Sequence, residues 1–281
     1  MYLSIDFEDF NHDLKRSLGI WKTGCLKSDV LWEKYNLINE VFKKSNSGKG
    51  SYGTFFCTGI IAKKEPALIK KIADDGHEIA CHYYFHDVMT SQSLKVIEKN
   101  ILKAKNILQD TSNKKVGGFR APYFAIEKNN SSHYKILEKF FDYDSSFSCT
   151  TKKELNLFKT KMGLQKLKII PVFQKNIANF NLKLGGSFIK LFPKLYMDWM
   201  INQSKKNQFV PHIYLHPYEF GNSEKLRVNR YDLKVLGITK SNYWRFRQYQ
   251  WIKFRNNSLE RKVESLIRFN KLDGLLSNFE N

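Results

Sequence analysis

The feature that most constrains the fold is an alternation of short apolar runs with longer stretches of helical periodicity. The stretches predict helices at residues 31–42, 66–73, 93–108 and 134–140. The runs predict strands at residues 2–6, 53–57, 78–81, 117–121, 143–147, 167–172 and 210–215. Because strands that alternate with helices are usually parallel, the pattern predicts an α/β fold with a mostly parallel sheet. The sheet can be either a barrel or doubly wound.

The end of the chain differs in character from the rest. After about residue 225 the sequence is basic and rich in aromatic side chains, and residues 259–269 predict a helix. We interpret residues 1–225 as one α/β domain. Residues 226–281 are then a C-terminal extension packed on the same domain rather than a second core, which is compatible with a length of 281 residues.

The net charge of +20 narrows the classes of partner. It can reflect a solvated, lysine-rich surface, or attraction to anions such as the inner face of a bacterial membrane or a phosphate-bearing substrate. Nucleic acid is the least favoured partner, because no known nucleic-acid-binding motif accompanies the charge. The first residues form a strand pattern rather than a signal peptide, and no apolar run reaches about 18 residues. We therefore expect a cytoplasmic protein, associated at most with the inner face of the membrane.

The four cysteines, Cys25, Cys57, Cys81 and Cys149, are scattered along the chain without paired spacing. Cys57 and Cys81 each end an apolar run. This distribution favours buried free thiols over disulfides or metal ligands.

Polar side chains gather where two of the predicted strands end. Asp6, Glu8 and Asp9 come at the end of the first strand, and three carboxylates so close together repel one another unless a positive group relieves them. His82 and His86 follow the third strand. Their spacing of four residues lets both imidazoles reach one metal ion.

Three further polar residues, Arg120, Asp144 and His216, come at the ends of later strands. His77 lies at the start of the third strand, away from these ends, and is expected to be structural. In a parallel α/β barrel, catalytic groups collect at the C-terminal ends of different strands. Together with the carboxylates and the histidine pair, these residues form a set suited to metal-assisted hydrolysis.

In order and spacing, these residues resemble the motifs of the NodB-like polysaccharide deacetylases, carbohydrate esterase family 4. The resemblance covers about residues 1–220, and the DxED opening is similar to that of a subgroup associated with exopolysaccharide and surface-polysaccharide synthesis. It implies a distorted (β/α) barrel of seven parallel strands. The corresponding segments are Ser4-Ile5-Asp6-Phe7-Glu8-Asp9, His82-Tyr83-Tyr84-Phe85-His86-Asp87, Arg120-Ala121-Pro122-Tyr123, Tyr143-Asp144-Ser145-Ser146 and Tyr214-Leu215-His216.

The resemblance also implies an activity: metal-dependent hydrolysis of the N-acetyl group of an acetamido sugar, with release of acetate. The metal would be Zn²⁺ or another divalent ion such as Co²⁺, Ni²⁺ or Mn²⁺. Its ligands would be His82, His86 and one carboxylate, either Glu8 or Asp9, and we favour Glu8.

The resemblance implies roles for five other residues. Asp6 is expected to be the general base and Arg120 to hold it in position. His216 is expected to be the general acid, oriented by Asp144. The backbone N–H of Tyr123 is expected to bind the oxyanion.

Several positions depart from the family pattern, among them Tyr83, Asp87 and Tyr214. These departures leave the substrate open: a bacterial surface polysaccharide, an oligosaccharide or a lipid-linked precursor. Two alternatives also stay open. One is a deformylase or another amidohydrolase on the same scaffold, and the other is a non-catalytic domain that binds glycan or membrane.

Overall fold

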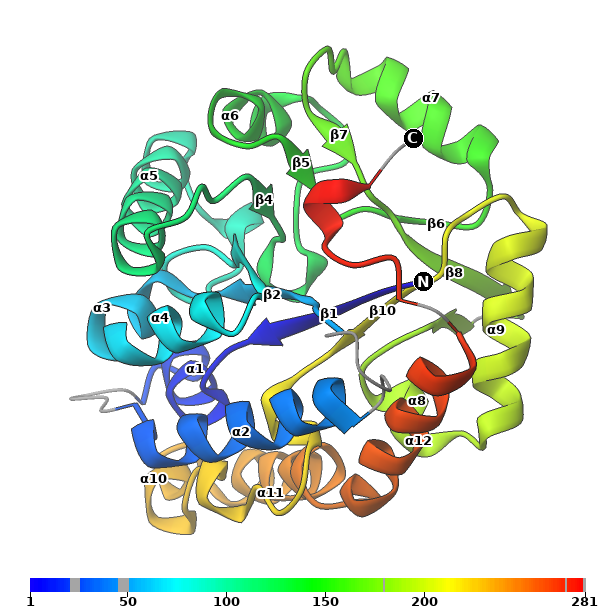
Figure 1. The fold of residues 1–281 in the computed structure, drawn as a ribbon. Coiled ribbons are helices and arrows are strands. Elements are labelled where there is room, and N and C mark those ends of the chain that lie inside the picture. The colour runs from blue at the N-terminus through cyan, green and yellow to red at the C-terminus, as the bar shows by residue number, and fades with distance from the viewer. Residues whose placement is uncertain (21–25, 45–50, 179, 271, 280–281) are drawn as a thin grey trace.

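The computed structural model describes residues 1–20, 26–44, 51–178, 180–270 and 272–279. Its main sheet has seven strands in the order β10-β1-β2-β3-β4-β5-β7, and all neighbours pair in parallel. The sheet curls, with helices around its outside, which confirms the predicted distorted (β/α) barrel (Figure 1). The strands are β1 (Tyr2–Phe7), β2 (Thr54–Cys57), β3 (Glu78–Cys81), β4 (Gly118–Phe119), β5 (Tyr143–Asp144), β7 (Lys168–Ile169) and β10 (His212–Leu215).

Several helices bury an apolar face in the main core. In α5, for example, Ile97, Ile101, Ala104 and Leu108 recur at intervals of three or four residues and are buried, as an amphipathic helix requires. The helices are α1 (Phe10–Ser17), α2 (Ser28–Lys44), α3 (Gly59–Lys64), α4 (Pro66–Asp74), α5 (Leu94–Ser112), α6 (Ser132–Phe140), α7 (Lys152–Met162), α8 (Ser187–Leu191), α9 (Lys194–Lys206), α10 (Arg230–Lys234), α11 (Ile238–Ile252) and α12 (Asn256–Phe269).

Three of the predicted strands end earlier in the main sheet than expected, and the one predicted at residues 117–121 ends at Phe119. After β5 the chain leaves the sheet, because Ser146 N donates to the Asp144 side chain instead of to a neighbouring strand. The run predicted at 167–172 is divided, since Val172 begins a strand of a second, three-stranded sheet. That sheet consists of β6 (Ser148–Cys149), β8 (Val172–Ile177) and β9 (Phe180–Lys183).

The C-terminal segment shares the main core. Leu259, Val263 and Leu266 of α12 belong to the same buried cluster as Leu3 and Ile5 of β1. The packing of the last helix on the barrel is therefore a feature of the structure, while the division of the chain at residue 225 stays a prediction.

The N-terminal end of the barrel is closed by the last described residues of the chain. Leu276 and Phe279 pack with Tyr2, Phe56 and Tyr143 in a separate apolar cluster. The short helix η5 (Leu276–Asn278) is held there because its first N–H donates to the Thr54 hydroxyl at 3.0 Å. Figure 1 shows this segment in red beside the N-terminus. The polar strand ends gather at the opposite end of the barrel.

Cys57, Cys81 and Cys149 are buried free thiols, as predicted, and Cys25 lies outside the described residues. None of the described helices combines the length and the low polarity that a membrane span needs.

Candidate functional site

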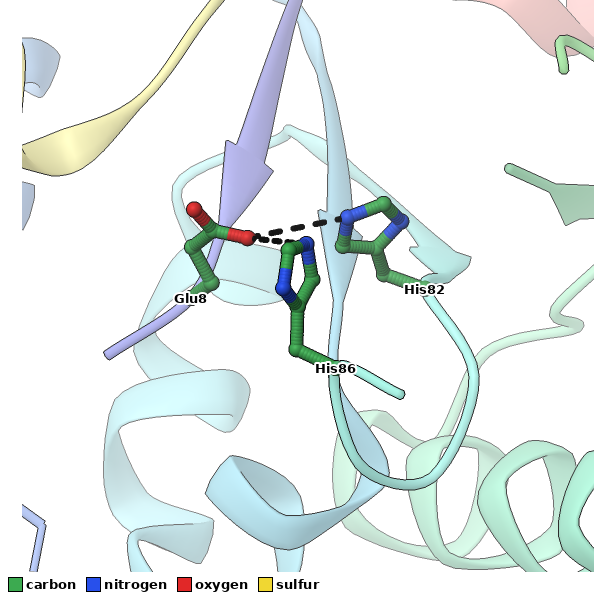
Figure 2. Close-up of side chains that lie close together, drawn as sticks. All are labelled: Glu8, His82 and His86. Atoms are coloured by element: carbon green, nitrogen blue, oxygen red, sulfur yellow. Dashed lines mark ion pairs between the residues drawn. The ribbon is translucent and has the colours of Figure 1, made fainter. Parts of the chain in front are cut away.

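Three side chains converge at the C-terminal ends of β1 and β3. Glu8 follows β1, His82 follows β3, and His86 lies in the loop after it (Figure 2). One ligand atom from each of the three lies within 4.8 Å of the other two, and all three residues are buried. Two nitrogens and one oxygen so placed leave room for further ligands, which is the donor set of a catalytic divalent metal site.

Two polar atoms of this cluster, Glu8 Oε2 and His86 Nδ1, have no hydrogen-bond partner among the described residues. Glu8 Oε2 lies 2.5 Å from His86 Nε2 and 3.8 Å from His82 Nε2. Within the described residues, Glu8 Oε2 is nevertheless a buried atom without a hydrogen bond. Burial alone would raise the pKa of Glu8, but His86, with smaller effects from His216 and His82, outweighs burial, and the pKa lies below its usual value. A buried anionic oxygen that needs a positive neighbour fits a cation at this position.

His82 is held in the tautomer that a metal ligand needs. Its Nδ1 lies 2.8 Å from the backbone carbonyl of Arg120, so Nδ1 must donate and Nε2 keeps its lone pair. Burial, with a smaller effect from His86, lowers the pKa of His82 to about 4. The ring is therefore neutral at physiological pH and directs a free lone pair toward Glu8.

Asp9 occupies a different place from the three. It is the N-cap of α1, where Oδ1 accepts the backbone N–H of His12 at 3.1 Å. Its other oxygen accepts the N–H of Lys27 at 2.5 Å. Both carboxylate oxygens of Asp9 accept backbone N–H groups, and Glu8 lies with the two histidines instead; which carboxylate binds the metal stays a prediction. The geometry favours Glu8.

Asp6 and Arg120 form a buried ion pair below the cluster. Arg120 Nη1 donates to Asp6 Oδ1, and the guanidinium also contacts Ser4, Ser145 and His212. Its Cζ lies over the Phe56 ring, 4.0 Å from the ring centroid. Burial opposes the ionisation of Asp6, but Arg120, His82 and His216 together outweigh burial and lower the pKa of the carboxyl, with Arg120 contributing both charge and a hydrogen bond. Asp6 is thus held ionised in a fixed orientation.

His216 is oriented by Glu219 and not by Asp144. His216 Nδ1 lies 3.1 Å from Glu219 Oε2, and the same oxygen accepts the His216 backbone N–H. Asp144 instead accepts both the N–H and the hydroxyl of Ser146. The expected pairing of Asp144 with His216 is therefore corrected, because the turn that follows β10 brings the nearer carboxylate under the imidazole.

The two groups expected to exchange protons have opposite pKa shifts. Burial would lower the pKa of His216, but Glu219 and two more distant carboxylates raise it to about 9. Asp6 is shifted the other way, and its Oδ2 lies 4.0 Å from His216 Nε2. At neutral pH one group is an anion and the other a cation, which is the arrangement that paired general base and general acid need.

Tyr123 stands at the rim of the site. Its backbone is left-handed, with φ of 56°, and its ring lies over His86 with centroids 4.3 Å apart. Tyr123 lines a cavity of about 260 Å³ together with Glu8 and His86. The oxyanion role expected for its N–H stays a prediction.

Glu219 and two tryptophans were not expected at this site. Glu219 comes three residues after His216 across a Pro-Tyr turn, a spacing that could have indicated the contact. Trp244 and Trp251 line the cavity from α11, and no motif of the sequence pointed to them.

Two family models match the chain. Residues 42–139 match the polysaccharide deacetylase family, and residues 143–277 match a domain of unknown function, DUF3473. The chain is 27% identical to the peptidoglycan deacetylase of Helicobacter pylori over 139 residues, 50% of this chain and 42% of that protein. It is 32% identical to the chitooligosaccharide deacetylase of Sinorhizobium fredii over 71 residues, 25% of this chain and 33% of that protein.

A similar fold occurs in a solved structure described as a polysaccharide deacetylase from Mycobacterium smegmatis. The two structures superpose with a TM-score of 0.53 at 16% identity, over 99% of this chain and 94% of the other. The chain spans less than half the length of the curated relatives that it matches.

Proposed function

We propose that this chain, whose residues 42–139 match the polysaccharide deacetylase family, is a deacetylase of the NodB-like type, carbohydrate esterase family 4, and that it hydrolyses the N-acetyl group of an acetamido sugar in a metal-dependent reaction. One observation carries this proposal: the ionised Asp6 and the cationic His216 face each other beside the buried cluster of Glu8, His82 and His86. A module that only binds glycan has no need of a base and an acid with opposite pKa shifts.

Glu8, His82 and His86 would hold the metal. We propose zinc, since imidazole and carboxylate ligands with open positions suit it, although Co²⁺, Ni²⁺ or Mn²⁺ would fit the same donors. When bound, such an ion would polarise the acetyl carbonyl and make a water molecule more acidic.

The residues of the chain would move the protons. Asp6 Oδ2 would accept a proton from the attacking water, and Arg120 keeps the carboxylate ionised and in place until then. His216 Nε2 would donate a proton to the departing nitrogen, with Glu219 fixing the ring through Nδ1. The amide C–N bond breaks, the water oxygen joins the acyl carbon, and the products are acetate and a free amine. The N–H of Tyr123 would bind the oxyanion.

The substrate and location are also proposals. The relatives named above are a peptidoglycan and a chitooligosaccharide deacetylase, which supports an acetylated glycan or its lipid-linked precursor as substrate. The net charge of +20 and the exposed aromatic residues Tyr243 and Phe246 on α11 support contact with the anionic inner face of a membrane. Sedimentation with vesicles containing phosphatidylglycerol, but not with neutral vesicles, is the expected result.

Acetate release tests the catalytic proposal. Metal-stripped and zinc-restored protein would be incubated with N-acetylated chitooligosaccharides, peptidoglycan fragments and lipid-linked sugars, each also offered as its N-formyl analogue. We expect zinc-dependent release that Asp6→Asn abolishes and that Asp74→Asn, at an exposed aspartate on α4, leaves intact. Formate release without acetate release would favour a deformylase. A protein that binds no divalent metal would contradict the proposal.

A further inference from the structure

One helix of the C-terminal segment forms a wall of the cavity at the candidate metal site. The cavity measures about 260 Å³ and is lined by Glu8 and His86 on one side. Trp244 and Trp251 of α11 line another side, more than 150 residues later in the sequence. Both tryptophans are half-buried. The helix therefore contributes aromatic surface directly beside the groups proposed to bind metal.

A continuous series of aromatic rings joins this wall to His216. The His216 ring stacks on Tyr218 at 4.9 Å and 18°. Tyr218 contacts Phe10 edge-on at 5.0 Å, and Phe10 contacts Trp251 at 5.8 Å. Trp244 follows at 6.2 Å from Trp251. Four rings of this series, those of Phe10, Tyr218, Trp244 and Trp251, line the cavity.

Asp13 places next to these aromatic rings a carboxylate oxygen that has no hydrogen-bond partner among the described residues. It lines the same cavity and is 5% exposed. Its Oδ1 lies 2.8 Å from His12 Nδ1, but within the described residues its Oδ2 is buried without a hydrogen-bond partner. An unpaired carboxylate oxygen is unfavourable in such a place unless a ligand donates to it.

The wall is held rigidly against the barrel. The buried ammonium of Lys190 donates to the carbonyls of Gln250 and Trp251 at the end of α11. Gln248 in the middle of the helix accepts the N–H of Val228 at 2.6 Å. The Arg247 guanidinium covers the outer face of Trp251 at 4.3 Å. A surface fixed in this way is prepared for a ligand before the ligand arrives.

We propose that α11 provides the sugar-binding wall of the site, with the pyranose ring of the residue to be deacetylated stacked on Trp244 and Trp251. A pyranose has apolar C–H faces, which suit aromatic rings, and a rim of hydroxyl donors, one of which would donate to Asp13 Oδ2. This binding would bring the acyl group to Glu8 and His86. The inference rests on the proposed function and names the class of ligand that the site takes.

The size of the cavity limits the ligand to one sugar ring. At about 260 Å³ it lies just below the range of roughly 300–1,000 Å³ that is usual for small-molecule pockets. The rest of an oligosaccharide would lie outside it.

Trp244→Leu and Trp251→Leu test the wall, because leucine keeps apolar volume and removes the ring face. The matched control is Tyr249→Leu, on the same helix but 44% exposed and not part of the cavity. The substrates are tetra-N-acetylchitotetraose and 4-nitrophenyl acetate, which carries an acetyl group without a sugar. We expect KM for the tetrasaccharide to rise about tenfold in each tryptophan variant, with kcat/KM for the ester within about twofold of wild type.

Further measurements distinguish a loss of sugar binding by the wall from misfolding of a variant and from failure of the proposed function. Thermal melting would show whether a variant is folded, and Asp13→Ala, which leaves α11 intact, should also raise KM for the tetrasaccharide more than for the ester. Equal losses on both substrates, or none on either, in folded variants would overturn the inference and leave the proposed function standing. If wild type hydrolyses neither substrate, the proposed function fails. Calorimetric binding of the tetrasaccharide, lost in Trp251→Leu but not in Tyr249→Leu, would then still support the wall.

Discussion

At the scale of single residues, the site depends on which carboxylate faces which histidine. Asp144 and Glu219 are both fully buried, and the order of motifs alone pointed to Asp144 as the partner of His216. The choice is decided by local geometry. The turn Pro217–Glu219 folds back, so that one Glu219 oxygen meets both the backbone N–H and the ring of His216. The order of motifs along the chain does not predict which of two buried carboxylates forms such a local hydrogen bond.

Glu219→Gln should shift the pH dependence of the reaction. Glu219 is the main cause that raises the pKa of His216 to about 9, so its neutralisation lowers that pKa. A general acid works only below its pKa. The alkaline limb of kcat/KM should therefore move to lower pH, by about one unit or more. Steady-state rates between pH 6 and 10 measure the shift.

Asp144→Asn is the control variant for the prediction on Glu219→Gln. It removes the charge of a buried carboxylate that contacts Ser146 and not His216. The alkaline limb of its kcat/KM profile should lie at the same pH as in wild type. If Asp144→Asn moves the limb and Glu219→Gln does not, the original pairing from the sequence was right after all.

At the scale of elements, the two neighbouring carboxylates after β1, Glu8 and Asp9, have different roles. Glu8 lies with His82 and His86 in the candidate metal site. Asp9 caps the start of α1, where it accepts the N–H of His12, and it also accepts the N–H of Lys27. Asp9→Ala should lower the free energy of unfolding by about 1–2 kcal/mol, because the first turn of α1 loses its cap. Chemical denaturation measures this loss.

The same variant should keep its metal. Zinc content after dialysis, measured by mass spectrometry, is expected to match wild type in Asp9→Ala and to fall to background in Glu8→Ala. The reverse result, with metal lost from the Asp9 variant alone, would make Asp9 the ligand.

The sequence predicted some elements well and missed others for a physical reason. The run at 78–81 coincides with β3, because a buried strand is uniformly apolar between polar ends. By contrast, α11 was not predicted, since its buried positions are Ser241, Gln248 and Ile252 rather than an apolar stripe. It is held in place by hydrogen bonds in which Gln248 accepts the N–H of Val228 and Lys190 donates to the carbonyl of Gln250. These long-range contacts leave no periodic signal, so the wall of the cavity could not be predicted either.

At the scale of the whole molecule, the barrel has one closed end and one reactive end. Leu276 and Phe279 fill the N-terminal end with apolar side chains. The ionisable residues of the candidate site lie at the other end, where parallel strands place their C-termini. Charges buried at one end make the fold sensitive to pH, because groups there keep protonation states that the unfolded chain does not share.

His77 gives a test of this sensitivity that is independent of the site. It is packed between Phe42 and Phe55, with ring centroids 4.9 Å away in each case, and Gly53 N donates to its Nδ1. Burial lowers its pKa from 6.5 to about 4. Between these values the unfolded chain binds a proton that the folded protein excludes. Its contribution to stability is therefore present above about pH 6.5 and is lost as the pH falls toward 4.

Urea unfolding of metal-free protein should accordingly show a loss of about 2 kcal/mol from His77 between pH 7 and pH 5. His82 has the same shift and adds a similar loss, which bound zinc would alter because zinc competes with protons for the ring. His77→Gln removes only the first contribution. The variant should be less stable than wild type at pH 7 but should lose less stability on acidification. An unchanged pH slope in His77→Gln would show that His77 is protonated in the folded protein, and that its packing among aromatic rings does not exclude the charge.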